Sequence, residues 1–183
     1  VLELLNAGYE VVVADNLCNS NLECLRRVEE LAGQVAALDC VTSRSDGSLV
    51  NILMDERAGL AVVELNDAQR FNTIGSALGD DLRSAVAWLS RRGNALSAVS
   101  LQAAGPHFCP GGNPYAARRK TVTTPLGFVL SLRELYHGFV QLCSLVTPVV
   151  GAVHGTLVGG ALAGCLHTDR LVAEQGSIFE HGN

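Results

Sequence analysis

Two glycine-rich turns contain the residues of this sequence whose types and spacing are best suited to chemistry. The first is Phe108–Asn113 (FCPGGN), and the second is His154–Gly160 (HGTLVGG). Glycine tolerates positive φ and lets the backbone approach a ligand closely. Backbone N–H groups in such turns can therefore stabilise negative charge on a ligand, whereas ordinary chain reversal is the alternative role.

The composition excludes several classes of protein. Hydrophobic residues make up 48% of the 183 residues and charged residues 17%, as in a globular chain. A net charge of -5 and the absence of a basic stripe argue against a nucleic-acid partner. The six cysteines show no CxxC spacing, so we expect neither a metal site nor a disulfide scaffold. Isolated thiols favour a reducing compartment, the cytoplasm or an organelle matrix.

One uncharged stretch, Leu145–Leu166, has the length of a membrane span. It contains Pro148 and five glycines, which break a lipid-exposed helix. We interpret it as a buried strand, turn and helix, and we expect no membrane association.

The elements that would position the two turns follow from hydrophobic periodicity. Val50–Met54 and Leu60–Leu65 are expected to form a hairpin across Asp55–Gly59. After it, the pattern predicts a helix capped by Thr73 and running to about Leu89, a strand at Ala98–Leu101, a helix at Leu126–Leu145, a strand at Val149–Val153 and a helix at Ala161–Leu166. Strands followed by strand-helix units predict an α/β fold with β-rich layers.

Four motifs, in order, resemble those of the crotonase (enoyl-CoA hydratase/isomerase) superfamily. Leu60–Asn72 resembles the first hairpin and the turn that follows it, and Phe108–Asn113 resembles the FCAGxD loop. Thr147–Ala161 resembles the strand and triple-glycine turn, and Asp169–Ala173 resembles the strand DIxxA. A lone pair of glycines would be a weak signal, but four ordered motifs over residues 50–183 are a specific one.

The resemblance implies a crotonase-like spiral of ββα units that binds an acyl thioester of coenzyme A or phosphopantetheine. The two oxyanion-hole donors fall on the N–H groups of Gly112 and Gly160. An enolate-like state gains about 2.7–4 kcal/mol from each such donor, and the helix after Gly160 adds partial positive charge. The resemblance implies no cofactor, an acyl-CoA or acyl carrier protein as partner, and a homotrimer for the complete protein.

The sequence departs from the hydratase pattern at both catalytic glutamates. The first should lie three residues after Gly160, where Ala163 stands, and the second falls on Asn183. Neither side chain can act as a general base. These absences resemble branches of the family that decarboxylate acyl thioesters, such as those of polyketide β-branching, because loss of carbon dioxide itself generates the enolate.

Other side chains are candidates near the site. Glu180 and His181 lie close to the second glutamate position, and a shift of two or three residues would bring either toward the thioester. Tyr115 could supply a proton or a hydrogen bond. The basic run after it could meet phosphates of coenzyme A or an acidic carrier protein, and it comprises Arg118, Arg119 and Lys120. A polar strand end and a solvated loop are the alternative interpretations.

The N-terminal segment has a different origin. Tyr9–Ala14 predicts a buried strand of a parallel sheet, and Asn21–Leu31 predicts an amphipathic helix. Val1–Gly33 resembles UDP-glucose 4-epimerase just after its glycine-rich loop. The resemblance places contacts to the adenosine of NAD on four residues, Asp15, Asn16, Asn19 and Ser20. The glycine loop and the catalytic pair of that family are missing, so we do not expect NAD binding.

We therefore divide the chain into a Rossmann-like βα remnant at 1–33, a linker at 34–49 and a crotonase-like domain at 50–183. We expect that domain to stop before the helices that close the pocket in its family. The leading function is a decarboxylase (lyase) of acyl thioesters. Enoyl-CoA hydratase/isomerase chemistry, non-catalytic thioester binding and an epimerase fragment remain as alternatives.

Overall fold

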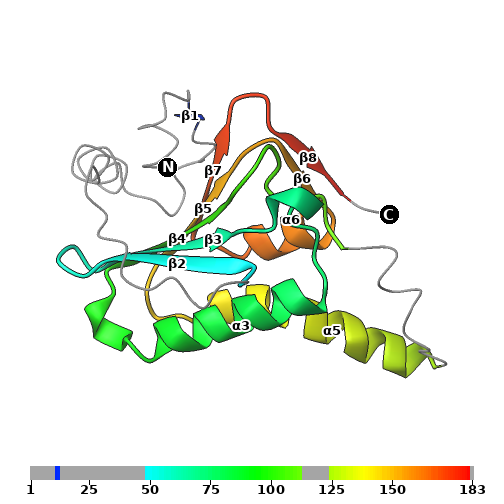
Figure 1. The fold of residues 1–183 in the computed structure, drawn as a ribbon, viewed down its shortest axis with the longest axis horizontal. Coiled ribbons are helices and arrows are strands. Elements are labelled where there is room, and N and C mark those ends of the chain that lie inside the picture. Colours follow the sequence, from blue (N-terminus) through cyan, green and yellow to red (C-terminus); the bar gives the residue numbers. More distant parts are fainter. Residues whose placement is uncertain (1–10, 13–47, 113–123, 182–183) are drawn as a thin grey trace.

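The computed structural model describes residues 11–12, 48–112 and 124–181, and its centre is a mixed six-stranded sheet (Figure 1). The strands are β1 (Val11–Val12), β2 (Val50–Asp55), β3 (Leu60–Leu65), β4 (Ala98–Ala103), β5 (Val149–Val153) and β7 (Arg170–Glu174). Their order is β1-β7-β5-β4-β3-β2, with β3, β4, β5 and β7 parallel. The α/β fold expected from the sequence, with strands followed by strand-helix units, is observed.

The hairpin of β2 and β3 forms as its sequence predicts. The strands pair antiparallel from Val50 against Leu65 to Asp55 against Leu60. Asp55 accepts hydrogen bonds from two N–H groups of the turn, and Gly59 at its end has a φ of 66°. Alternate residues of both strands are buried, as expected for a sheet with one covered face.

Two helices cover one face of the sheet and pack on each other, α3 (Ser76–Ser90) and α5 (Pro125–Leu142) (Figure 1). They approach closely because two glycines lie at their contact. A Cβ on Gly79 would lie 2.8 Å from the Leu135 carbonyl oxygen, and one on Gly138 would lie 2.9 Å from Leu82. Their facing apolar side chains, with those of the sheet, form one core.

The predicted cap of α3 is wrong. The helix begins at Ser76 after Gly75, and no side chain caps it. The Thr73 hydroxyl instead donates to the Arg70 carbonyl, because a 3-10 helix at Ala68–Arg70 precedes it. The other short 3-10 helix of the described residues, Gly93–Ala95, connects α3 to β4.

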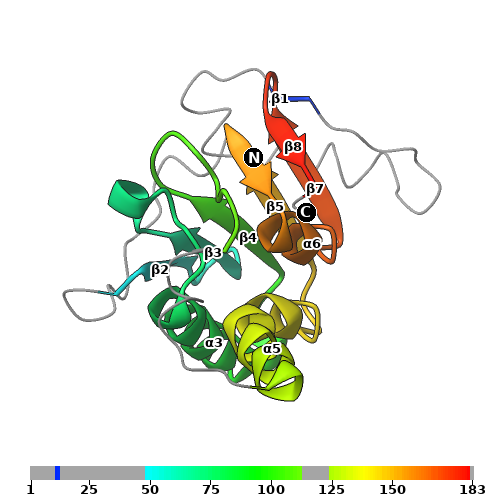
Figure 2. The same ribbon diagram turned by 90° about the vertical axis from the view of Figure 1, so that its right-hand side faces the viewer.

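The sequence also missed a second, smaller sheet. Strand β6 (Thr156–Val158) lies inside the predicted turn and pairs in parallel with β8 (Ile178–Glu180). Helix α6 (Gly160–Cys165) follows β6 directly. Figure 2 shows α6 beside the strands of the main sheet, on the side of α5. The strand preceding the second glycine pair is therefore held by pairing rather than left as a free loop.

The N-terminal strand pairs differently from the prediction. Val11 and Val12 pair antiparallel with Ala173 and Glu174 of β7, so a parallel arrangement is wrong for this strand. The four residues assigned to NAD contacts, Asp15, Asn16, Asn19 and Ser20, lie outside the described residues. No helix within the described ranges is long and apolar enough to cross a bilayer.

Candidate functional site

The two glycine turns start from one pair of hydrogen-bonded residues. Cys109 and Leu157 form a parallel bridge: the Cys109 N–H donates to the Thr156 carbonyl at 3.0 Å, and the Val158 N–H donates to the Cys109 carbonyl at 3.1 Å. Gly112 lies three residues after Cys109, and Gly160 lies three residues after Leu157. Because the bridge is parallel, both segments leave it in the same direction, and the two glycines come to lie side by side.

The orientation of each amide follows from its neighbours. The Gly111 carbonyl accepts from the Ile74 N–H at 2.8 Å. The C=O and N–H of one trans peptide point in opposite directions, so the Gly112 N–H points away from Ile74. In the same way, the Gly159 carbonyl accepts from the Ala163 N–H at 3.0 Å, within the first turn of α6. The Gly160 N–H therefore points out of that turn and away from the helix.

Tyr136 of α5 lies against both glycines. A Cβ built on Gly112 would be 2.9 Å from the Tyr136 hydroxyl oxygen, and one built on Gly160 would be 2.5 Å from the same atom. Because both Cβ positions are close to the same oxygen atom, they must also be close to each other. The Tyr136 ring also packs directly on Gly160, so no larger residue fits there without displacing it. Both glycines thus border one small space that contains a phenol hydroxyl.

A largely apolar pocket of about 170 Å³ opens beside Gly160. The residues that line it come from α5, α6 and the turn after α6, and they are Tyr136, Phe139, Val140, Gly160, Ala163, Gly164 and His167. None of them is a carboxylate. The pocket has room for part of an acyl chain, and the described residues that line it include no acidic side chain to activate water.

Asn72 anchors the loop that carries the first turn. It is fully buried with a φ of 56°, a conformation that asparagine tolerates better than most residues. Its side-chain oxygen accepts from the Asp67 N–H at 2.8 Å, and its amide donates to the carbonyls of Ala104 and His107 at 2.8 and 3.1 Å. One side chain therefore ties the ends of β3 and β4 to the segment that leads to Gly112.

The structure describes some of the other predicted site residues, Glu180 and His181, but not all of them. The Glu180 carbonyl accepts from the Gly159 N–H at 2.9 Å, so β8 runs beside the second turn, while Glu180 itself is exposed. His181 follows β8 and is exposed. Tyr115, Arg118, Arg119 and Lys120 lie outside the described residues, as does Asn183. The backbone of Glu180 thus lies next to the second glycine turn, and the roles of Arg118, Arg119 and Lys120 stay predictions.

Burial raises the pKa of the Cys109 thiol from 9.0 to about 11. The unfolded chain therefore releases this proton at a lower pH than the folded protein does. The stabilising contribution is complete below pH 9 and is lost as the pH rises through about 11. We expect the free energy of unfolding to fall by about 2–3 kcal/mol over this range.

Urea unfolding between pH 8 and 11.5 checks this expectation. Cys109→Ala should remove that part of the decline, whereas Cys143→Ala, which changes an exposed thiol, should retain it. An equal decline in the Cys109→Ala protein would contradict the assignment. Burial also raises the pKa of Cys165 from 9.0, so a second decline that likewise begins near pH 9 is expected in both proteins.

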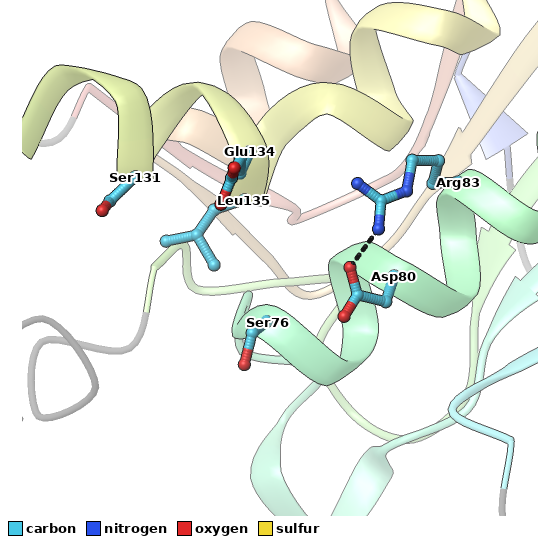
Figure 3. A pocket seen from close by; sticks show the side chains of 6 residues that line it. All are labelled: Ser76, Asp80, Arg83, Ser131, Glu134 and Leu135. Carbon is cyan, nitrogen blue, oxygen red and sulfur yellow. Dashed lines mark hydrogen bonds and ion pairs between the residues drawn. The ribbon is translucent and has the colours of Figure 1, made fainter. Parts of the chain in front are cut away.

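A second, polar pocket of about 200 Å³ lies between α3 and α5 (Figure 3). Its lining includes Ser76, Ser131 and Glu134. The Arg83 guanidinium in it is already paired with the Asp80 carboxylate, at 2.5 Å, and both side chains are substantially exposed. Such a pair contributes little to stability. Within the described part of the chain, no group of three or more His, Cys, Asp and Glu side chains could hold a metal ion.

Sequence reasoning missed Tyr136 as a site residue. The sequence places it only within the helix expected at Leu126–Leu145, and in the structure the neighbouring Phe139 belongs to the core. The hydroxyl of Tyr136 could have indicated a role in the site, since a phenol on an apolar helix face needs a polar neighbour when it is buried.

Comparison with known proteins identifies relatives of two kinds. A probable enoyl-CoA hydratase of Mycobacterium tuberculosis, EchA12, is 31% identical over 140 residues, which cover 74% of this chain and 48% of the relative. A second, EchA14, is 28% identical over 129 residues, 70% of this chain and 49% of that protein. The chain thus spans about half the length of these curated relatives. No protein-family model matches it.

The N-terminal segment matches separately. UDP-glucose 4-epimerase of Bacillus subtilis is 61% identical over 33 residues, which cover 18% of this chain and 10% of the epimerase.

The solved structures that superpose on this chain include enoyl-CoA hydratases, like the first group of sequence relatives. An enoyl-CoA hydratase of Mycobacterium smegmatis superposes with a TM-score of 0.65 at 25% identity, covering 72% of this chain and 49% of that one. A putative enoyl-CoA hydratase/isomerase (crotonase) of Legionella pneumophila gives a TM-score of 0.65 at 16% identity over 73% of this chain and 51% of its own, which supports the fold alone.

Proposed function

Starting from homologues in the enoyl-CoA hydratase (crotonase) superfamily, which match this chain by sequence and by structure, we propose that the protein binds an acyl thioester and stabilises its enolate. The thioester is one of coenzyme A or of phosphopantetheine on a carrier protein. The reaction we propose is decarboxylation, and it needs no cofactor.

The observation that carries the proposal is the position of Gly112 and Gly160 around one space. Their N–H groups are the proposed donors to the thioester carbonyl oxygen. The Ile74–Gly111 and Ala163–Gly159 hydrogen bonds fix the two peptides, so the donors need no reorganisation when negative charge develops. Fixed donors of this kind contribute about 2.7–4 kcal/mol each to the stability of an enolate. Helix α6 has six residues, so its dipole adds little to that sum.

Decarboxylation fits the side chains around these amides. Ala163 lines the pocket where the family pattern has a glutamate, and none of the described lining residues has a carboxylate. In decarboxylation the bond between the α carbon and the substrate carboxylate breaks, and its electron pair forms the enolate. Carbon dioxide leaves, and the α carbon then takes a proton from water or from a side chain. No general base is needed to start the reaction.

Hydration or isomerisation of an enoyl thioester is the second candidate. The curated relatives that match most of the chain are named probable enoyl-CoA hydratases. The backbone of Glu180 also pairs with the second glycine turn. If its side chain turns toward the pocket, Glu180 is the base that hydration requires.

A panel of thioesters separates the two reactions. The purified protein is incubated with malonyl-type, glutaconyl-type and enoyl thioesters, each on coenzyme A and on a phosphopantetheine carrier, and products are identified by mass spectrometry. We expect carbon dioxide release from a carboxylated acyl group, unchanged by Glu180→Gln. Hydrated product that disappears in Glu180→Gln would establish the second candidate. Binding of coenzyme A thioesters without any turnover would indicate a non-catalytic module.

The remaining assignments concern the ends of the chain and its assembly. We propose that Arg118, Arg119 and Lys120 meet the phosphates of the thioester carrier, and that the complete protein is a homotrimer. We also propose that residues 1–33 are an epimerase-like piece joined by a linker at 34–49 to the crotonase-like domain. Absence of NAD binding in a protein extended upstream through the glycine loop would separate this piece from a working epimerase.

A further inference from the structure

We propose that the hydroxyl of Tyr136 is a third hydrogen-bond donor to the thioester carbonyl oxygen, alongside the two backbone amides. The inference rests on the proposed function, because it assigns a role to Tyr136 in the same site.

The position of the hydroxyl is the first support. It lies 2.9 Å and 2.5 Å from the Cβ positions built on Gly112 and Gly160, so one hydroxyl lies close to both glycines whose amides are the proposed donors. The ring is held between α5 and α6, since it packs on Gly160 while the neighbouring Phe139 packs on Gly164. The phenol therefore comes from α5, an element separate from the two turns that carry the amides.

The chemistry of the surrounding residues is the second support. Among the described residues that line the apolar pocket, two side chains have a polar group, Tyr136 and His167. One ring nitrogen of His167, Nδ1, is already bonded to the Ala163 carbonyl at 2.6 Å, and this histidine is exposed. Tyr136 is half-buried, and no residue of the pocket competes with a ligand for its proton.

The protonation state of Tyr136 agrees with this role. Burial, with a smaller contribution from Cys109, raises the pKa of Tyr136 above its usual value of 10.0. The hydroxyl therefore remains protonated at neutral pH, so that it can donate a hydrogen bond without transferring its proton. A neutral donor in an apolar site stabilises an enolate more strongly than the same group in water does.

Tyr136→Phe tests the proposal, because it keeps the ring that packs on Gly160 and removes only the hydroxyl. We expect kcat for the thioester identified above to fall by about 10²–10³, with KM changed by less than about threefold. Tyr9→Phe makes the same chemical change outside the crotonase-like segment and should leave both constants unchanged.

An infrared measurement separates a donor from a packing residue. An unreactive acyl thioester labelled with carbon-13 at the carbonyl is bound to each protein, and its C=O stretch is compared with that in water. We expect a shift to lower frequency that is smaller in Tyr136→Phe. If Tyr136→Phe does not fold, site-specific replacement of Tyr136 by 3-fluorotyrosine, a stronger donor, should enlarge the shift instead.

The outcomes are distinguishable. An unchanged kcat and an unchanged carbonyl stretch in Tyr136→Phe would overturn the role of Tyr136 and leave the proposed function intact. A wild-type protein that neither binds nor converts any thioester of the panel would overturn both. A lower kcat in Tyr136→Phe with an unaltered carbonyl stretch would also overturn the proposal that Tyr136 is a third donor. The hydroxyl would then act on something other than the carbonyl oxygen.

Discussion

Gly160→Ala is expected to lower kcat/KM for the thioester by at least about 10²-fold, the loss associated with one disabled oxyanion donor. The added Cβ would overlap the ring and the hydroxyl of Tyr136. Either the ring moves into the space beside the amides, or the turn moves away from Gly112. Both responses separate the donors from the thioester oxygen. Steady-state kinetics with the substrate found in the thioester panel give the measurement.

Gly75→Ala is the matched control, because nothing lies within 4 Å of a Cβ at that position and its φ of -132° suits any residue. Gly75 precedes the first residue of α3, so the change should cost at most about 1 kcal/mol of stability and leave kcat/KM as in the wild type. A Gly160→Ala protein with the wild-type rate would show that Gly160 does not face the substrate.

Asn72→Ala is expected to lower the free energy of unfolding by about 3–5 kcal/mol, because several buried backbone groups lose their partner together. The Asp67 N–H and the carbonyls of Ala104 and His107 are bonded to this side chain. Alanine also tolerates the left-handed φ of 56° less well than asparagine does. Urea unfolding followed by circular dichroism measures the difference.

Asn51→Ala is the comparison for that experiment. Asn51 is half-buried, and its side chain makes one hydrogen bond, to Glu64 on the opposite strand at 3.0 Å. Its removal should cost about 1 kcal/mol. Equal losses in the two variants would mean that the three bonds of Asn72 contribute no more than one surface bond.

The elements of the main sheet could be predicted because their signals are local. Leu60–Leu65 and Val149–Val153 form strands with the predicted bounds, and each is an apolar run bounded by a turn. The helix predicted at Leu126–Leu145 begins at Pro125, where Thr124 caps it, and ends at Leu142. Cys143 and Leu145, just beyond this end, are apolar, so the periodicity alone did not mark the end of the helix.

The elements that were missed depend on distant partners. Thr156–Val158 has the composition of a turn, and it is a strand because Ile178–Glu180 pairs with it. Thr73 was expected to cap α3, but its hydroxyl is used by the short helix before it. Val11 and Val12 have the composition of a parallel strand, yet pair antiparallel at the sheet edge. Local composition holds no information about which neighbour a strand will have.

The candidate site was predictable only as far as the motifs reach. Gly112 and Gly160 follow from the resemblance, and their closeness is observed in the structure. Tyr136 could not be assigned from its helical spacing, because that spacing also fits a core position. Tyr136 can lie against the site because Gly112 and Gly160 have no side chains that would exclude its ring. Each glycine is 24 residues away from Tyr136 in the sequence, so local spacing gives no sign of this contact.

The bridge between Cys109 and Leu157 has a mechanical consequence. Both glycine turns follow the same pair of hydrogen bonds, and Gly112 and Gly160 lie at equal distances along the chain from it. Because this bridge joins the two segments directly, we expect a displacement of one turn to be accompanied by the same displacement of the other. A one-residue insertion in either loop would break that equality, so we expect length changes here to be far more damaging than comparable changes in the hairpin between β2 and β3.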